Sequence, residues 1–150
     1  MKKEIIHQLF FPFSPQTVWE YLTKPELMEQ WLMPTNFEPV VGQPFQFKTK
    51  PIQSLGFDGI FYCTVLEIVP LQKLSYSWKG GPGDGTITLD SIVVWTLTAK
   101  ENGTELLLQH SGFTEVENLS IYNGMKEGWL KNMQKMENLI KNKTYGTANA

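Results

Sequence analysis

Arginine is absent from this sequence: its 13 basic residues are all lysines, and 15 acidic residues outweigh them to give a net charge of −2. Arginine provides the bidentate contacts by which proteins hold phosphate groups and guanine bases. A slightly acidic chain that lacks arginine and has no stripe of lysines is a poor candidate for nucleic-acid binding. We therefore expect no nucleic-acid partner.

Cysteine and histidine are also scarce. Cys63 is the single cysteine, so no internal disulfide can form, and His7 and His110 are the two histidines. These side chains belong to different segments and lack the spacing of metal ligands. The G-x-S-x-G, H-E-x-x-H and Walker patterns are missing as well, and the glycine-rich stretch 79–86 is typical of a flexible connection. We expect no metal and no cofactor, and we assign no catalytic residue.

Long apolar runs are missing too. No stretch approaches the roughly 18 apolar residues of a membrane span, and the first residues lack the apolar core of a signal peptide, so we expect a cytoplasmic protein without a membrane span. The sequence does contain 41% hydrophobic and 13% aromatic residues, which is enough for a sizeable core. We interpret residues 1–150 as one domain that ends in a flexible tail at about 142–150.

Two short helices are predicted between residues 14 and 31. Ser14 is expected to cap the first of them, with Pro15 at the first helical position. In the stretch TKPELMEQW, Thr23 and Glu26 have the spacing of a capping box around Pro25. Each helix has an apolar side, so both are expected to pack against a sheet.

Strands are predicted for residues 3–11 and for five segments between Phe37 and Gly112, in the pattern of an antiparallel meander. Around Gly59 both faces of the predicted strand are apolar, so the orientation of Phe61 and Cys63 stays open. In the other segments, alternation gathers large side chains on one face of the sheet: Phe45, Phe47, Leu74, Tyr76, Trp78, Val93, Trp95 and Leu97.

The stretch TELLLQHSGF, residues 104–113, alternates residue by residue and points His110 inward together with Leu106 and Leu108. An imidazole in that position is either satisfied by protein groups or used in function. We interpret His110 as mainly structural, with a second role in orienting a ligand. Burial is expected to keep the ring neutral, because it disfavours the charged form.

Residues 119–141 carry apolar side chains at spacings of three and four, which predicts one long amphipathic helix. Gly124 and Gly128 cost this helix about 1 kcal/mol each relative to alanine. Their missing side chains either let the backbone approach the sheet or leave space for a guest molecule. The apolar stripe should lie across the aromatic face of the sheet, and it consists of Tyr122, Met125, Trp129, Met133, Met136 and Ile140.

Several stretches together resemble one known family: FPFSPQTVWEYLTKPELMEQWLMP, VGQPFQF, VLEIVPLQKLSYSW, VVWTLTAKENGTELLLQHSGF and EGWLKNMQKM. They are similar to the activator of heat-shock-protein-ninety ATPase homologue family, which belongs to the START-like, Bet v 1-like (SRPBCC) superfamily. The resemblance spans roughly residues 5–140. It implies an α+β helix-grip fold, in which a curved antiparallel sheet wraps around a long C-terminal helix, with two short helices after the first strand and a cavity between sheet and helix.

We therefore expect a non-catalytic protein that binds a small, largely apolar ligand, such as a lipid, polyketide or flavonoid-like molecule, between the sheet and the long helix. Two alternatives stay open. One is an interaction module for a chaperone or another protein, and the other is a cyclase-like enzyme that uses His110, Tyr76 or Glu67 on a bound ring. The candidate ligand-binding residues are Trp31, Phe45, Phe47, Phe61, Tyr76, Trp78, Trp95, His110, Met125, Trp129 and Met133.

Overall fold

The computed structural model describes residues 2–114 and 119–148. Its six strands form one antiparallel sheet with the order β1-β6-β5-β4-β3-β2, so β2 to β6 are the predicted meander and β1 pairs with β6. Along the chain the elements are β1 (Lys2–Phe11), α1 (Pro15–Thr23), α2 (Pro25–Trp31), β2 (Pro44–Lys48), a short 3-10 helix η1 (Gln53–Leu55), β3 (Ile60–Val69), β4 (Lys73–Gly80), β5 (Leu89–Lys100), β6 (Gly103–Thr114) and α3 (Leu119–Ala148).

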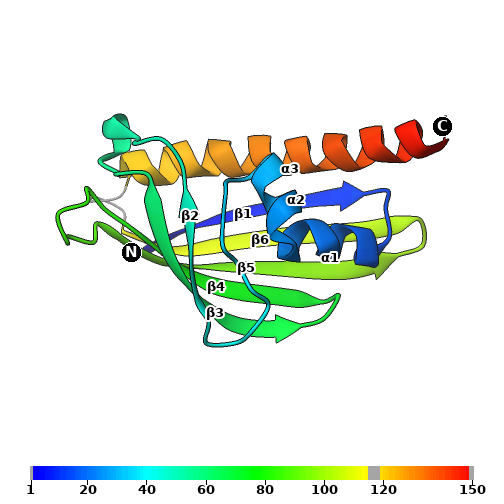
Figure 1. Ribbon diagram of the computed structural model, residues 1–150, viewed down its shortest axis with the longest axis horizontal. Coiled ribbons are helices and arrows are strands. Elements are labelled where there is room, and N and C mark those ends of the chain that lie inside the picture. The colour runs from blue at the N-terminus through cyan, green and yellow to red at the C-terminus, as the bar shows by residue number, and fades with distance from the viewer. Residues whose placement is uncertain (1, 115–118, 149–150) are drawn as a thin grey trace.

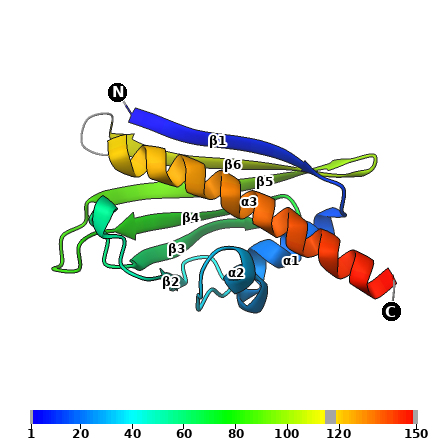
Figure 2. The same cartoon turned by 90° about the horizontal axis from the view of Figure 1, so that it is seen from above.

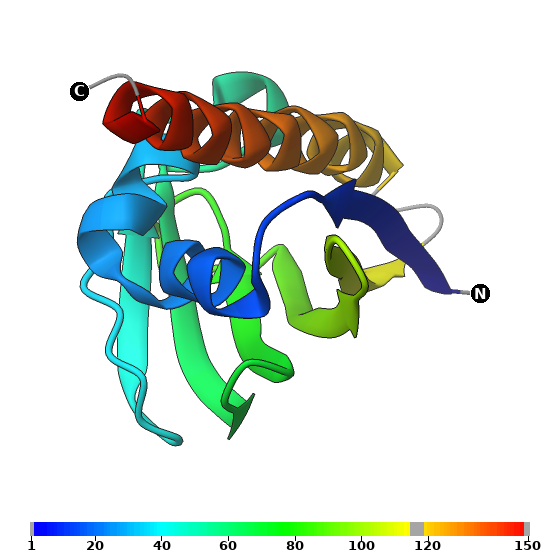
Figure 3. The same cartoon turned by 90° about the vertical axis from the view of Figure 1, so that its right-hand side faces the viewer.

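Helix α3 lies along one face of the sheet for most of its length (Figure 1). Seen end-on, the strands curve beneath this helix (Figure 3), and from above the helix crosses them obliquely (Figure 2). Helices α1 and α2 pack on each other, α1 also contacts β5 and β6, and α2 contacts α3. This is the α+β arrangement that the sequence predicts. No helix in the described part of the chain is long and apolar enough to cross a membrane.

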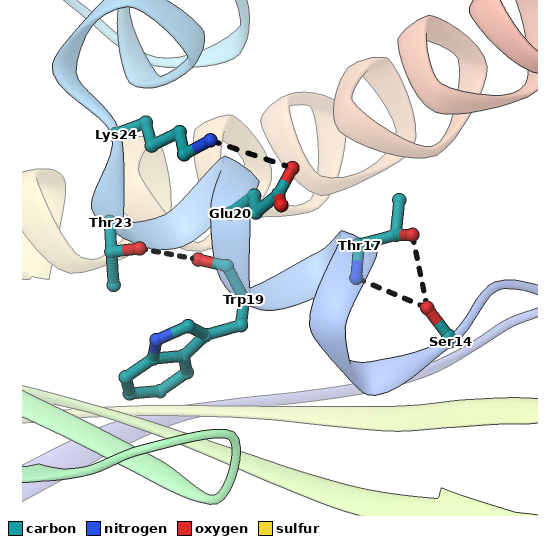
Figure 4. A network of polar contacts seen from close by, with 6 residues as sticks. All are labelled: Ser14, Thr17, Trp19, Glu20, Thr23 and Lys24. Carbon is teal, nitrogen blue, oxygen red and sulfur yellow. Dashed lines mark hydrogen bonds and ion pairs between the residues drawn. The ribbon is translucent and has the colours of Figure 1, made fainter.

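Figure 4 shows the contacts around the two short helices. The Thr17 backbone N–H donates a hydrogen bond to the Ser14 hydroxyl at 3.2 Å, so Ser14 caps α1 as predicted. The capping box predicted for α2 is wrong, because Lys24 occupies the N-cap and no side chain caps this helix. Thr23 is instead the last residue of α1, and its hydroxyl donates to the Trp19 carbonyl one turn earlier at 2.8 Å.

The inner face of the sheet carries the side chains that alternation predicts. The strand that the sequence left open now has a clear orientation, because Phe61 and Cys63 are buried on the same face as Val65. The pairing of β3 with β4 shifts register between Val65 and Glu67. Buried with them on the inner face are Phe45, Phe47, Leu74, Tyr76, Trp78, Val93, Trp95 and Leu97.

Helix α3 presents the predicted apolar stripe to this face. Tyr122 and Met125, near its start, are half-buried. A hydrogen bond joins β1 to this helix: His7 Nε2 donates to the Lys126 carbonyl at 2.7 Å. The helix continues past residue 141 to Ala148, into the segment predicted as a flexible tail. The buried members of the stripe are Trp129, Met133, Met136 and Ile140.

Candidate ligand-binding site

A chain of hydrogen bonds runs from α3 through His110 into the sheet. The Trp129 indole N–H donates to His110 Nδ1 at 2.9 Å. Because an indole nitrogen is only a donor, Nδ1 carries no proton and the neutral ring is protonated at Nε2. Nε2 then donates to Ser91 Oγ at 2.8 Å, and the Ser91 hydroxyl donates to the Trp78 carbonyl at 2.7 Å. Both ring nitrogens of His110 therefore have protein partners.

Burial keeps the His110 ring neutral. The side chain is fully buried, and its ring packs against the rings of Trp78, Phe113 and Trp129. Removal from water lowers the pKa of His110 from 6.5 to about 3, because the charged form loses its hydration. The imidazole thus links α3 to the sheet through hydrogen bonds to Trp129 and Ser91. A ligand that formed a hydrogen bond with this ring would have to replace one of these two.

A glycine bulge accounts for the sequence HSGF. Strict alternation would turn Phe113 outward, away from His110. The pairing of β6 with β1 shifts between Ser111 and Phe113, and Gly112 occupies the extra position with φ of 115°. A Cβ at Gly112 would lie 2.8 Å from the Asp90 carbonyl oxygen, so glycine is required here. The bulge returns Phe113 to the inner face, where its ring centre lies 4.7 Å from that of His110.

Trp78 lies in the middle of the aromatic core. Its ring centre is 4.8 Å from that of Phe61, 5.1 Å from that of Phe47 and 5.4 Å from that of Trp129. Aromatic pairs at these separations contribute beyond the area they bury. The sheet and α3 are therefore joined by ring contacts as well as by the His110 hydrogen bonds.

Tyr76 and Trp95 form a second part of the core. The Trp95 indole N–H donates to Tyr76 Oη at 3.0 Å, and Trp31 packs edge-on against Trp95 with ring centres 5.9 Å apart. Burial raises the pKa of the Tyr76 phenol and of the Cys63 thiol, so both stay protonated at neutral pH. Neither group has the charge that a nucleophile requires.

A cavity of about 240 Å³ lies between α3, the sheet and the segment that links β2 to β3. Its wall consists of Leu32, Met33, Thr49, Ile52, Leu55, Phe57, Phe61, Trp78, Gly124, Met125, Gly128, Trp129 and Asn132. Among the predicted ligand-binding residues, Phe61, Trp78, Met125 and Trp129 belong to this wall. The remaining predicted residues are buried in the core outside it: Trp31, Phe45, Phe47, Tyr76, Trp95, His110 and Met133.

One wall of the cavity was not anticipated from the sequence. Ile52 and Leu55 come from the segment around η1, for which the sequence predicts neither helix nor strand, and Phe57 begins the predicted strand 57–69 but precedes β3, which starts at Ile60. A bridge between Ile52 and Phe57 folds this segment into a compact turn. The available signal was the concentration of three apolar side chains in a short stretch that also contains glycine. Leu32 and Met33 also line the cavity and were not predicted to do so; they directly follow α2, outside any predicted helix or strand.

Gly124 and Gly128 of α3 both line the cavity, but the space around each of them differs. A Cβ added at Gly128 would meet no heavy atom within 4 Å, whereas one at Gly124 would lie 3.2 Å from Leu55 Cδ1. Gly128 therefore leaves space, and Gly124 lets the η1 segment approach the helix. Thr49 and Asn132 supply polar side chains to the wall, and none of the described residues that line the cavity carries a charge.

The groups named for the enzymatic alternative do not meet in this cavity. His110 and Tyr76 lie in the core outside its wall, while Glu67 is exposed and forms an ion pair with Lys73 at 2.9 Å. Within residues 2–114 and 119–148, no group of three or more His, Cys, Asp or Glu side chains could hold a metal ion.

A curved antiparallel sheet, a long C-terminal helix and two short helices after the first strand define a helix-grip protein of the START-like, Bet v 1-like superfamily. Within it, the family described as Activator of Hsp90 ATPase homolog 1-like protein matches residues 12–141. The chain belongs to this family, which confirms the resemblance found in the sequence. No curated protein gives a significant match.

Solved structures agree on the fold. Protein MLL2253 from Mesorhizobium loti is 32% identical, with a TM-score of 0.83, over 93% of this chain and 98% of that one. CalU16 from Micromonospora echinospora is 21% identical, with a TM-score of 0.71, over 93% of this chain and 74% of that one. DynU16, a protein of the dynemicin biosynthetic locus, is 20% identical with a TM-score of 0.73, and 92% of this chain spans 47% of it.

Proposed function

We propose that this protein binds a small, neutral, largely apolar ring molecule in the cavity beside Trp78 and Trp129, and that it does so without transforming the ligand. The observation that carries the proposal is the cavity itself, an apolar space with few polar groups between sheet and helix. None of the described residues in its wall has an ionisable side chain. General acid-base chemistry on a bound molecule would therefore find no proton-transfer group among these residues.

The size and polarity of the cavity narrow the class of ligand. A volume of about 240 Å³ is below the 300–1,000 Å³ typical of pockets for drug-sized molecules, so a compact molecule of two or three rings fits better than a long-chain lipid. A carboxylate or an amine would lose its hydration there without gaining a counter-charge. Neutral polyketide-like or flavonoid-like rings satisfy both conditions, and the biosynthetic locus of DynU16 is in keeping with such a role.

The experiment is a titration of tryptophan fluorescence with neutral two- and three-ring compounds, because Trp78 and Trp129 both line the cavity. Saturable quenching is expected for the unmodified protein. Gly128→Leu should place a side chain in the open space and weaken binding at least about tenfold. Gln134→Leu is the matched control, since it adds the same side chain on the exposed face of the same helix, and it should leave affinity unchanged.

Two results would contradict the proposal. One is the absence of saturable quenching for every ring compound up to its solubility limit, which would leave the interaction-module hypothesis as the better reading of the family. The other is equal affinity of Gly128→Leu and the unmodified protein, which would place the binding elsewhere.

A further inference from the structure

One buried hydrogen-bond donor in the cavity wall has no partner. Trp31, Trp95 and Trp129 each donate an indole N–H to a protein acceptor at 2.8 to 3.0 Å. Trp78 is 2% exposed, and its Nε1 is the one buried side-chain nitrogen or oxygen without a hydrogen bond in the described part of the chain. A buried polar group left unpaired is costly, and native proteins keep few of them.

Packing prevents the Trp78 ring from turning to find a protein acceptor. The rings of Phe47, Phe61 and Trp129 surround it with centres 4.8 to 5.4 Å away. The backbone is fixed as well, because the Ser91 hydroxyl donates to the Trp78 carbonyl at 2.7 Å. Trp78 is therefore a pre-organised donor within the wall of an otherwise apolar cavity.

We propose that the ligand carries a carbonyl-type oxygen that accepts a hydrogen bond from Trp78 Nε1, so that the cavity selects neutral ring ketones and quinones over ring hydrocarbons of the same shape. An indole N–H donates and cannot accept, so the ligand atom that meets it must be an acceptor. The described residues of the wall carry no charge, which favours a neutral carbonyl over a carboxylate. This inference rests on the proposed function and specifies the ligand of the same site.

Fluorenone and fluorene provide the test, because they differ in one carbonyl on the same three-ring frame. Placing a carbonyl in an apolar cavity costs hydration unless a donor meets it, so a cavity without a free donor would favour fluorene. With Trp78 Nε1 as donor, fluorenone should bind about tenfold more tightly than fluorene. Titration calorimetry on the unmodified protein measures both affinities.

A Trp78→Phe variant removes the donor while keeping an aromatic ring, and it should abolish or reverse the preference for fluorenone. Nitrogen-15 NMR of the unmodified protein gives a readout that does not depend on how well this variant folds. The five tryptophans give up to five indole N–H signals. Fluorenone should move the Trp78 signal downfield through the new hydrogen bond, whereas fluorene should leave it without such a shift.

The outcomes separate the two proposals. Binding of both compounds with equal affinity, or tighter binding of fluorene, together with no downfield shift of the Trp78 signal, would overturn the acceptor inference and leave ligand binding intact. That result would mean that the Trp78 N–H donates to a water molecule or has no hydrogen-bond partner. Absence of binding for both compounds would overturn this inference and the proposed function together.

Discussion

Replacing His110 with glutamine should isolate a pH dependence of stability that arises from one side chain. In the folded protein, burial lowers the pKa of His110 to about 3, whereas in the unfolded chain the ring takes up a proton near its ordinary pKa of 6.5. Between these two values the unfolded state binds more protons, so the free energy of unfolding rises with pH. The stability contributed by the neutral ring is complete above pH 6.5 and is lost as the pH falls toward 3.

The size of the effect between pH 7 and pH 5 depends on the unfolded state, because the folded ring stays neutral over that range. Protonation of His110 in the unfolded chain lowers the free energy of unfolding at pH 5 by about 2 kcal/mol relative to pH 7. Glutamine does not titrate, and its amide offers an acceptor toward Trp129 and a donor toward Ser91. Other titrating groups are common to both proteins and cancel in the comparison.

The assay is urea unfolding of the unmodified protein and of His110→Gln at pH 5, 6 and 7. The difference in free energy of unfolding should move by about 2 kcal/mol in favour of the variant between pH 7 and pH 5. His110→Leu should show the same pH dependence as His110→Gln, because leucine does not titrate either. Its free energy of unfolding should be lower still, by about 1 to 3 kcal/mol at every pH, because the Trp129 N–H loses its acceptor. A pH-independent difference between His110→Gln and the unmodified protein would contradict the lowered pKa of His110 in the folded state.

Three further changes test how the helices are held. Trp129→Ala should lower the free energy of unfolding by about 3 to 5 kcal/mol, and an unchanged urea midpoint would mean that α3 is docked differently. Gly128→Ala should raise the free energy of unfolding by about 1 kcal/mol, because alanine favours the helix and its methyl group meets open space. Calorimetry should then show a melting temperature about 3 °C higher, and a lower melting temperature would contradict the open space at Gly128. Ser14→Ala should cost about 1 kcal/mol through loss of the α1 cap, measured against Thr23→Ala, whose hydroxyl caps no helix; equal losses would contradict this assignment.

The sheet and α3 could be predicted from the sequence because their signals are periodic. Alternation correctly placed the aromatic side chains of β2, β4 and β5 on one buried face, and spacings of three and four found the buried stripe of α3. Short-range polar signals were less decisive. Ser14 caps α1 as predicted. Thr23 does not cap α2, because it is still part of α1, and the single residue between the two helices, Lys24, is the N-cap of α2.

The cavity could be predicted only in part, because its wall combines segments that no single period connects. Trp78 and Trp129 were found from a strand and a helix that each have a regular pattern. Ile52, Leu55 and Phe57 belong to an irregular segment, and their contact with the cavity depends on how that segment folds back. Burial without a period is a property of the tertiary structure, so alternation and helical spacing do not report it.

The unpaired Trp78 donor was also beyond sequence reasoning. Whether a tryptophan N–H finds an acceptor depends on distances across the core, and three other buried tryptophans in the same chain do find one. Their sequence contexts do not distinguish them from Trp78. Trp78 lines the cavity, and its Nε1 has no hydrogen-bond partner in the described part of the chain.

A crystal structure of the protein grown with fluorenone would show whether the cavity beside Trp78 and Trp129 holds a small neutral ring. We expect electron density for the ring system against Gly128 and between the η1 segment and α3, with the fluorenone oxygen at hydrogen-bond distance from Trp78 Nε1. Density for the compound at another place on the protein, with this cavity closed by its own side chains, would contradict this expectation.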